Sequence, residues 1–185
     1  MNKKKDLVIS LQWIHSYALS YLSRYSSSSK NLEIVIKRRI KKISNSNELI
    51  SQEIESWIHI TIDKLEKTKL IDDLEFAKAK AISLFKSGKP SRIIYSKLKS
   101  LGISDEHIEN AIKNVSYNYI EDNSDEDIDY KAAKIFARKK NISINNFNSG
   151  NLKQTNNQIQ KFQRAGFSFA TISKIVNLNL IEYDS

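Results

Sequence analysis

Residues that could carry acid–base or metal chemistry are few in this sequence and form no constellation. His15, His59 and His107 lie in separate parts of the chain, with no metal-ligand spacing and no catalytic carboxylate arrangement beside them. The absence of cysteine excludes disulfides, thiolate metal sites and a cysteine nucleophile. We therefore expect surface or partly buried histidines, no catalytic residue, no metal and no cofactor.

Paired and alternating aspartates are the next candidates for chemistry. Adjacent residues such as Asp72 and Asp73 do not face each other on a helix, and aspartate is favoured at a helix start in any case. Asp125, Asp127 and Asp129 alternate as in a calcium loop, but the glycine and the distal glutamate of that loop are missing. The sequence also has no glycine-rich phosphate loop and no serine-nucleophile motif. It predicts no enzyme.

Basic side chains are the remaining candidates for functional residues. The 185 residues include 30 Lys and Arg against 21 Asp and Glu, which gives a formal charge of +9. Such a charge favours a polyanionic partner, namely nucleic acid, a nucleoprotein or an anionic membrane face. Many Lys-rich proteins are basic without binding anything, and every soluble helix has a charged outer face. The charge alone therefore leaves both interpretations open.

The helices that position these side chains are clearest between Leu70 and Ala111. Apolar residues at helical spacing predict a first helix, which the segment Ser87–Pro90 ends because Gly88 tolerates positive φ and proline cannot continue a helix. A second helix should end at Gly102 in the left-handed conformation. Ser104 then suits the N-cap of a third helix. The stretch predicts a complete three-helix unit.

This unit recurs further along the chain. Asp129 lies 56 residues after Asp73, each four residues before an alanine of the first-helix stripe. Gly166 lies 64 residues after Gly102, each two residues before a serine N-cap. A period above 50 residues with a preserved helix–turn–helix order is typical of stacked helical repeats. We expect an all-α fold of three tandem three-helix repeats in an elongated, curved array.

The expected repeats divide the chain into three segments. Repeat one covers 1–69 and includes a basic N-terminal lead-in and extra residues at its second joint. Repeat two covers 70–117. Repeat three covers 118–185 and begins with an acidic linker over 118–129. Its first joint, over 141–156, is rich in asparagine and is the best candidate for a mobile loop, with helices resuming near Gln158.

A basic outer face on the second helices, extended by the basic end of one first helix, is the candidate surface for a partner or for DNA. The direction opposite the apolar stripe follows from 100° per residue. The candidate residues are Lys37, Arg38, Lys41, Lys42, Lys89, Arg92, Lys99, Arg138, Lys139, Lys140, Lys153, Lys161 and Arg164. The sign of the charge is informative here, because acidic residues collect in the linker and at helix starts.

Several motifs carry a resemblance to a known family. The segment Leu70–Asp73 with Phe76–Ala77, followed by Gly88, Arg92–Ile93 and Leu101–Ile103, resembles the core signature of the RecX family. The segment Ala165–Phe169 resembles the closing motif of that family. The opening motif is similar to Tyr21–Tyr25 with Ser28 and Leu32. The resemblance covers the chain roughly from residue 12 to residue 177.

The resemblance implies a non-catalytic regulator of the RecA recombinase. RecX proteins bind the RecA filament on single-stranded DNA and suppress its ATPase, strand-exchange and coprotease activities, so we expect a role in DNA repair, recombination and the SOS response. The alternative is a sequence-tolerant DNA-binding repeat protein that acts without RecA, and a second alternative is a helical adaptor whose charge is incidental. We expect a cytoplasmic monomer with no membrane span, because no stretch approaches about 18 apolar residues.

Overall fold

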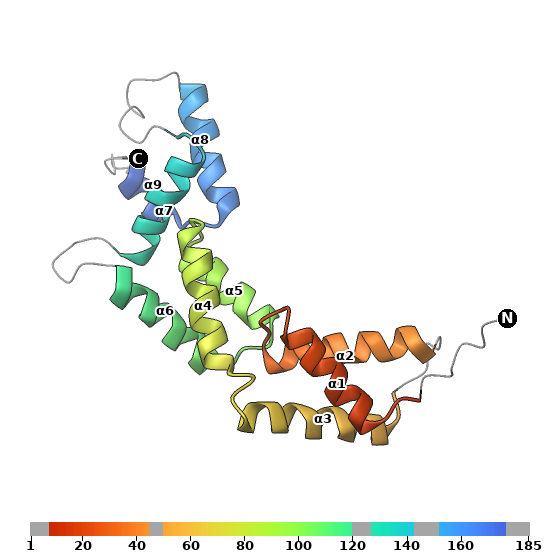
Figure 1. The fold of residues 1–185 in the computed structure, drawn as a ribbon. Coiled ribbons are helices and arrows are strands. Elements are labelled where there is room, and N and C mark those ends of the chain that lie inside the picture. The colour runs from red at the N-terminus through yellow and green to blue at the C-terminus, as the bar shows by residue number, and fades with distance from the viewer. Residues whose placement is uncertain (1–7, 45–49, 120–126, 143–151, 177–185) are drawn as a thin grey trace. The chain divides into compact units, whose positions relative to one another are not determined.

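The structure is a computed structural model that describes residues 8–44, 50–119, 127–142 and 152–176, with the side chains of 152–154 excepted. These residues form nine α-helices and no strand (Figure 1). The helices are α1 Leu11–Leu22, α2 Ser29–Ser44, α3 Gln52–Lys67, α4 Asp73–Lys86, α5 Ser91–Ser100, α6 Asp105–Tyr119, α7 Ile128–Lys139, α8 Leu152–Ala165 and α9 Phe169–Val176. The prediction of an all-helical fold is confirmed.

Serine and aspartate begin the helices as the sequence indicated. Ser104 Oγ accepts a hydrogen bond from the backbone nitrogen of His107 at 3.3 Å, and Ser168 Oγ accepts one from Thr171 at 3.1 Å. Asp72 Oδ1 accepts from the backbone nitrogens of Leu74 and Glu75, both at 3.1 Å. These oxygens satisfy N–H groups that have no partner within their own helix.

Left-handed residues end five of the helices. The predicted positive φ is confirmed at Gly102 (79°) and Gly166 (96°), and Gly88 has the same conformation (79°). The sequence interpretation missed Lys69 (58°) and Asn141 (52°), which end α3 and α7 in the same way. After each of these two residues, the next backbone nitrogen donates to a carbonyl five residues earlier: Leu70 to Leu65 and Ile142 to Ala137, both at 2.9 Å. This is the bond of a Schellman cap.

The limits of the linker and of the loop predicted in the third segment were wrong. The acidic linker expected over 118–129 is shorter, because α6 continues to Tyr119, whose ring packs on Phe85 with centroids 5.4 Å apart, and α7 already begins at Ile128. Helix α8 begins at Leu152, inside the expected loop and before Gln158. The few apolar residues of α8 recur at amphipathic spacing among many polar ones, and Phe162 on that helix is fully buried. The lead-in 1–7, the joint 45–49 and the loop residues 143–151 lie outside the described residues.

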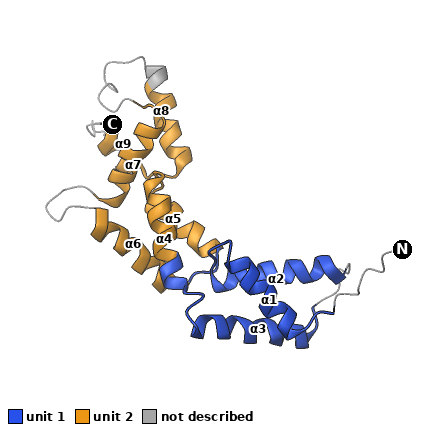
Figure 2. Ribbon diagram, in the orientation of Figure 1, with its two compact units in different colours: residues 1–76, 101–103 blue, residues 77–100, 104–185 orange. Residues whose placement is uncertain are grey.

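The chain forms two compact units (Figure 2). Unit 1 comprises residues 1–76 and 101–103, and unit 2 comprises residues 77–100 and 104–185. In unit 1, α1, α2 and α3 pack on one another around a core that includes Ile14, Ala18, Leu32, Ile36, Ile40, Ile58, Ile62, Leu65 and Ile71.

The interior of unit 2 contains a cluster of aromatic rings. Helix α5 packs on α6, and α9 packs on both α7 and α8. Phe136, Phe162 and Phe167 meet pairwise with ring centroids 5.2–5.6 Å apart. The contact of Phe167 with Phe162 is the hydrophobic contact expected beside the Gly166 cap. These rings anchor the C-terminal helices around one interior.

Candidate interaction surface

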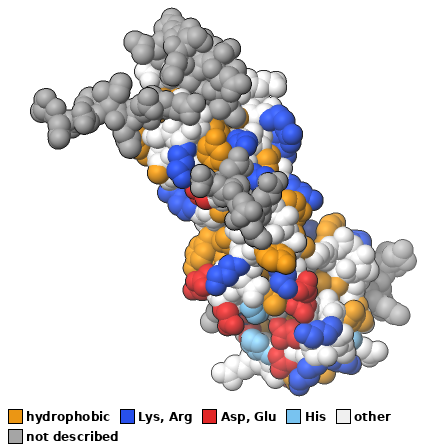
Figure 3. Space-filling view, turned by 90° about the vertical axis from the view of Figure 1, so that its left-hand side faces the viewer, with side chains coloured by type: hydrophobic (Ala, Val, Ile, Leu, Met, Phe, Trp, Pro, Cys, Tyr) orange, Lys and Arg blue, Asp and Glu red, His pale blue; other side chains and the backbone are white. Residues whose placement is uncertain are grey.

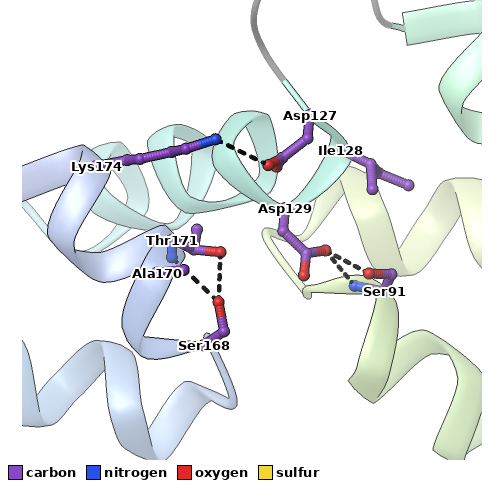
Figure 4. A pocket seen from close by; sticks show the side chains of 8 residues that line it. All are labelled: Ser91, Asp127, Ile128, Asp129, Ser168, Ala170, Thr171 and Lys174. Atoms are coloured by element: carbon purple, nitrogen blue, oxygen red, sulfur yellow. Dashed lines mark hydrogen bonds and ion pairs between the residues drawn. The ribbon is translucent and has the colours of Figure 1, made fainter.

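Each unit contains a helix whose first turn is capped by an aspartate from a distant helix. In unit 1, Asp73 Oδ1 accepts hydrogen bonds from the backbone nitrogen and the hydroxyl of Ser29, at 2.8 and 3.0 Å. In unit 2, Asp129 Oδ1 accepts from the same two groups of Ser91, at 2.7 and 2.6 Å (Figure 4). Ser29 begins α2 and Ser91 begins α5. A carboxylate is favoured here because unpaired N–H groups and the helix dipole meet at that end.

Two of the left-handed glycines, Gly102 and Gly166, lie beside the same capped helices. A Cβ atom on Gly102 would come within 2.3 Å of Cβ of Lys30, near the start of α2. A Cβ atom on Gly166 would come within 2.6 Å of Cγ1 of Ile93, near the start of α5. Ser28 adds a bond of its own, since its hydroxyl donates to the Leu101 carbonyl at 2.6 Å. Both glycines are therefore required by backbone conformation and by close approach.

The basic residues of α2 differ in their exposure and in their ion pairing. Arg38, Lys41 and Lys42 are exposed, as predicted. The prediction was wrong for Lys37, whose side chain is only 28% exposed and forms ion pairs with Glu33 at 2.8 Å and with Glu55 at 2.6 Å. Lys37 faces α3 because an acidic residue on that helix is within its reach.

The Lys37 network perturbs two ionisable groups. Hydrogen bonds with Glu33 and then Glu55 raise the pKa of Lys37 above its ordinary value. Burial by itself raises the pKa of Glu33, but hydrogen bonds from Lys30 and Lys37 outweigh it and leave that pKa below its ordinary value. Both shifts favour the charged forms. The network therefore stabilises unit 1 and does not present a free cation to a partner.

The remaining candidates of the basic face lie on α5, α7 and α8 and the turns that follow or precede them. Lys99 pairs with Asp105 at 2.7 Å, and Lys139 donates to the Lys86 carbonyl at 2.9 Å. Lys89 is half-buried and the side chain of Lys153 is outside the described part. The others are exposed: Arg92, Arg138, Lys140, Lys161 and Arg164. On the face drawn in Figure 3, basic side chains lie among acidic and hydrophobic ones and form no single continuous patch.

A hollow of about 330 Å³ lies beside the Asp129–Ser91 contact in unit 2 (Figure 4). Its lining residues are Ser91, Asp127, Ile128, Asp129, Ser168, Ala170, Thr171 and Lys174. Asp127 caps α7 by accepting from the Tyr130 nitrogen at 2.7 Å, and its other oxygen pairs with Lys174 at 3.6 Å. These polar side chains bond to one another or to the ends of helices, so helix capping accounts for their presence in the hollow.

Within the described residues, no group of three or more His, Asp or Glu side chains could hold a metal ion. None of their helices is both long and apolar enough to cross a membrane.

The sequence interpretation missed the role of two aspartates. Asp73 and Asp129 were matched by their spacing and otherwise treated as residues typical of a helix start. The structure shows that each caps a different helix, 44 or 38 residues earlier in the chain. A serine at the first position of each capped helix was the available signal, although the two serine-to-aspartate distances differ.

Comparisons with known proteins agree with the fold. No protein-family model matches the chain. The regulatory protein RecX of Myxococcus xanthus (strain DK1622) is 28% identical over 177 residues, which cover 95% of this chain and 90% of that protein. The crystal structure of RecX from Lactobacillus salivarius superposes with a TM-score of 0.61 at 21% identity, covering 91% of this chain and 97% of that one. A second RecX crystal structure also gives 0.61, at 18% identity, covering 91% of this chain and 73% of that one. The resemblance found in the sequence is thereby confirmed: the chain is similar to RecX regulatory proteins over nearly its full length.

Proposed function

We propose that this protein binds the RecA filament on single-stranded DNA and inhibits the ATPase, recombinase and coprotease activities of RecA. Through this inhibition it modulates DNA repair and recombination as a cytoplasmic, monomeric regulator without catalytic activity of its own. The observation that carries the proposal is the similarity to a RecX regulatory protein over 95% of the chain.

We further propose that the chain consists of three tandem three-helix repeats, with boundaries after residue 69 and after the end of α6 at Tyr119. The equivalence of the Asp73–Ser29 and Asp129–Ser91 contacts supports this organisation. The approaches of Gly102 to Lys30 and of Gly166 to Ile93 support it as well. In each case the same two positions of one repeat touch the first turn of the second helix of the repeat before it. A recurring junction of this kind is what a stacked repeat requires.

A repeat protein suits a partner that is itself a repeating filament. Each exposed ion pair contributes only about 0.2–1 kcal/mol. Several such contacts made by one chain gain from effective concentration, because the first one holds the others near their targets. The exposed members of the basic face that serve this role are Arg38, Lys41, Lys42, Arg92, Arg138, Lys140, Lys161 and Arg164.

Co-sedimentation separates this function from the alternative of DNA binding without RecA. The protein is mixed with RecA filaments on single-stranded DNA, with RecA alone and with the DNA alone. We expect strongest recovery with the assembled filament. Equal recovery with bare DNA and with filaments would favour the DNA-binding alternative. No recovery with either would favour a helical adaptor whose charge is incidental.

A further inference from the structure

Four aromatic side chains form a strip along α1 and into the turn that follows it. Trp13, Tyr17 and Tyr21 recur every fourth residue, which places them along one side of α1. Tyr25 follows in the turn after the helix. The rings of Trp13 and Tyr17 are parallel within 5°, with centroids 5.5 Å apart. Those of Tyr21 and Tyr25 are 5.1 Å apart. We call these four residues the aromatic strip.

Two arginines lie over rings of the aromatic strip. The guanidinium carbon of Arg39, on α2, is 6.0 Å from the centre of the Tyr17 ring. That of Arg24 is 5.7 Å from the centre of the Tyr25 ring, and its Nε donates to the Ser20 carbonyl at 3.1 Å. Both arginines are exposed. Cations held at rings in this way are attracted by the ring face and remain available to a phosphate.

The charge of this part of unit 1 is strongly one-sided. Residues 11–44, which contain α1 and α2, include one acidic side chain, Glu33, and seven basic ones: Arg24, Lys30, Lys37, Arg38, Arg39, Lys41 and Lys42. Glu33 is already paired with Lys30 and Lys37. Helix α3 carries the opposite bias, with four acidic residues, Glu53, Glu55, Asp63 and Glu66, against two basic ones, Lys64 and Lys67. A polyanion is therefore drawn to α1 and α2 and repelled from α3.

Only part of the aromatic strip packs against the core of unit 1. Trp13, Tyr17 and Tyr21 pack one side against the core of unit 1, yet none of them is buried, and Tyr25 is 55% exposed. Core packing alone explains the inner edges of three rings. It does not explain Tyr25, the flanking arginines or the absence of free acidic neighbours on α1 and α2.

We propose that the aromatic strip binds the unpaired bases of single-stranded DNA by stacking, with Arg24 and Arg39 beside the phosphates. Positively charged surfaces with exposed aromatic rings bind single strands in this way without sequence preference. Rings four residues apart on a helix are about 6 Å apart along its axis, whereas bases in a duplex strand are spaced by about 3.4 Å. The strip thus fits an extended strand with separated bases and does not fit a duplex. This inference rests on the proposed function for its biological setting and names the surface that touches the DNA.

Tryptophan fluorescence tests the location of the contact. The chain has two tryptophans, Trp13 in the aromatic strip and Trp57 on the acidic α3. Trp57→Phe leaves Trp13 as the only reporter, and Trp13→Phe leaves Trp57 as the matched control. With oligothymidylate as the probe, we expect quenching of Trp13 and an unchanged Trp57 signal. Quenching confined to Trp57, or of neither residue at saturating DNA, would overturn the proposal.

Affinity measurements separate stacking from charge. Tyr17→Leu and Tyr25→Leu keep the net charge, so we expect each to weaken oligothymidylate binding about 5- to 100-fold without changing the salt dependence. Arg39→Gln should instead flatten the slope of log affinity against log salt by about 0.7. Tyr17→Phe keeps a stacking ring and should restore binding. Tyr117→Leu, at a residue 86% exposed on α6, is the control and should have no effect.

The results also distinguish this inference from the proposed function. Circular dichroism verifies that each variant is folded. If folded Tyr17→Leu and Tyr25→Leu bind oligothymidylate as tightly as the unaltered protein, the strip is not a stacking surface, even where RecA is still inhibited. If RecA is unaffected by the protein while DNA binding depends on the strip, the proposed function fails and this inference stands.

Discussion

Asp73 and Ser29, 44 residues apart in the chain, are joined by two hydrogen bonds to a single carboxylate oxygen. Asp129 and Ser91 repeat the arrangement in unit 2. An aspartate at the start of one helix thus accepts hydrogen bonds from the first residue of another helix. This makes the position sensitive to substitution, although aspartate at a helix start is ordinarily replaceable.

Removal of the distant cap should destabilise unit 1. We expect Asp73→Ala to lower the free energy of unfolding by about 1–2 kcal/mol, because the N–H of Ser29 loses its charged acceptor. Urea unfolding measures the change. The control is Asp63→Ala, an exposed aspartate on α3, which should cost at most about 0.5 kcal/mol. In the double variant with Ser29→Ala, the two losses should be clearly less than additive. Full additivity would show that the contact contributes nothing.

Substitution of the left-handed glycines should be costly in both units. A residue with a Cβ at φ near +80° costs roughly 1–2 kcal/mol, and at Gly166 it would also approach Ile93 within 2.6 Å. Gly102→Val and Gly166→Ala should therefore each lower the unfolding free energy by at least about 1 kcal/mol. Ser96→Val, at an exposed position inside α5, controls for the added side chain. Wild-type stability in either glycine variant would contradict the account of these caps.

Acid should weaken unit 1 through Glu33. The pKa of Glu33 is lowered in the folded state, so its stabilising contribution is present above the unfolded value near 4.5 and is lost as the pH falls through the folded value. Glu33→Gln should be less stable at pH 7 and should lose less stability than the unaltered protein between pH 6 and pH 3. Unfolding free energies at several pH values measure this. Parallel pH profiles would exclude the role assigned to Glu33.

Alkali should act on the same network through Lys37. Its pKa is raised in the folded state, so its contribution is complete below the unfolded value of about 10.5 and disappears as the pH rises through the higher folded value. Lys37→Met should therefore flatten the loss of stability above pH 10. Lys41→Met, at an exposed position on the same helix, is the matched control and should leave the alkaline limb of the profile unchanged.

Charge reversal should distinguish the outer face of α2 from net charge. Arg38 and Lys41 are exposed and have no ion-pair partner within the described residues. We expect Arg38→Glu with Lys41→Glu to weaken filament binding markedly while the stability changes by no more than about 0.5 kcal/mol per site. Lys64→Glu with Lys67→Glu on α3 makes the same change of charge within the same unit. Equal losses in both variants would mean that only the total charge matters.

The choice of α2 for this experiment comes from the structure. From helical geometry alone, Arg92 and Lys99 were also expected to lie on an outer face that makes no contact with other helices. The structure pairs Lys99 with Asp105 and places an Arg92 nitrogen 3.7 Å from the Cβ position of Gly166. Reversing them would therefore disturb local contacts of unit 2. A helical wheel gives the direction in which a side chain leaves its helix, but it cannot show which neighbouring helix contacts that side chain.

Local signals in the sequence were sufficient for most of the fold. Apolar periodicity and glycine or serine caps predicted the helices around Gly102 and Gly166, because these signals depend on a few neighbouring residues. The start of α8 was missed, since asparagine and glutamine outnumber its apolar residues. Lys69 and Asn141 were missed as caps because a left-handed residue other than glycine is stabilised by its surroundings.

The candidate surface was less predictable than the fold. The repeated aspartates were visible, but their partners lie 44 and 38 residues away, and no local rule gives such a pairing. In the sequence, the spacing of the aromatic strip is equally typical of a buried apolar face. Only the exposure of Tyr25 and the positions of Arg39 and Arg24 beside the rings show that part of the strip lies outside the core.

Hydrolysis of ATP by RecA on single-stranded DNA tests the central claim most directly. The rate is followed while this protein is added at increasing ratios to RecA. The account predicts dose-dependent inhibition that is substantial well below one molecule per RecA protomer, and no ATP hydrolysis by the protein alone. An unchanged RecA rate at saturating protein, with tight binding to the bare DNA, would contradict it.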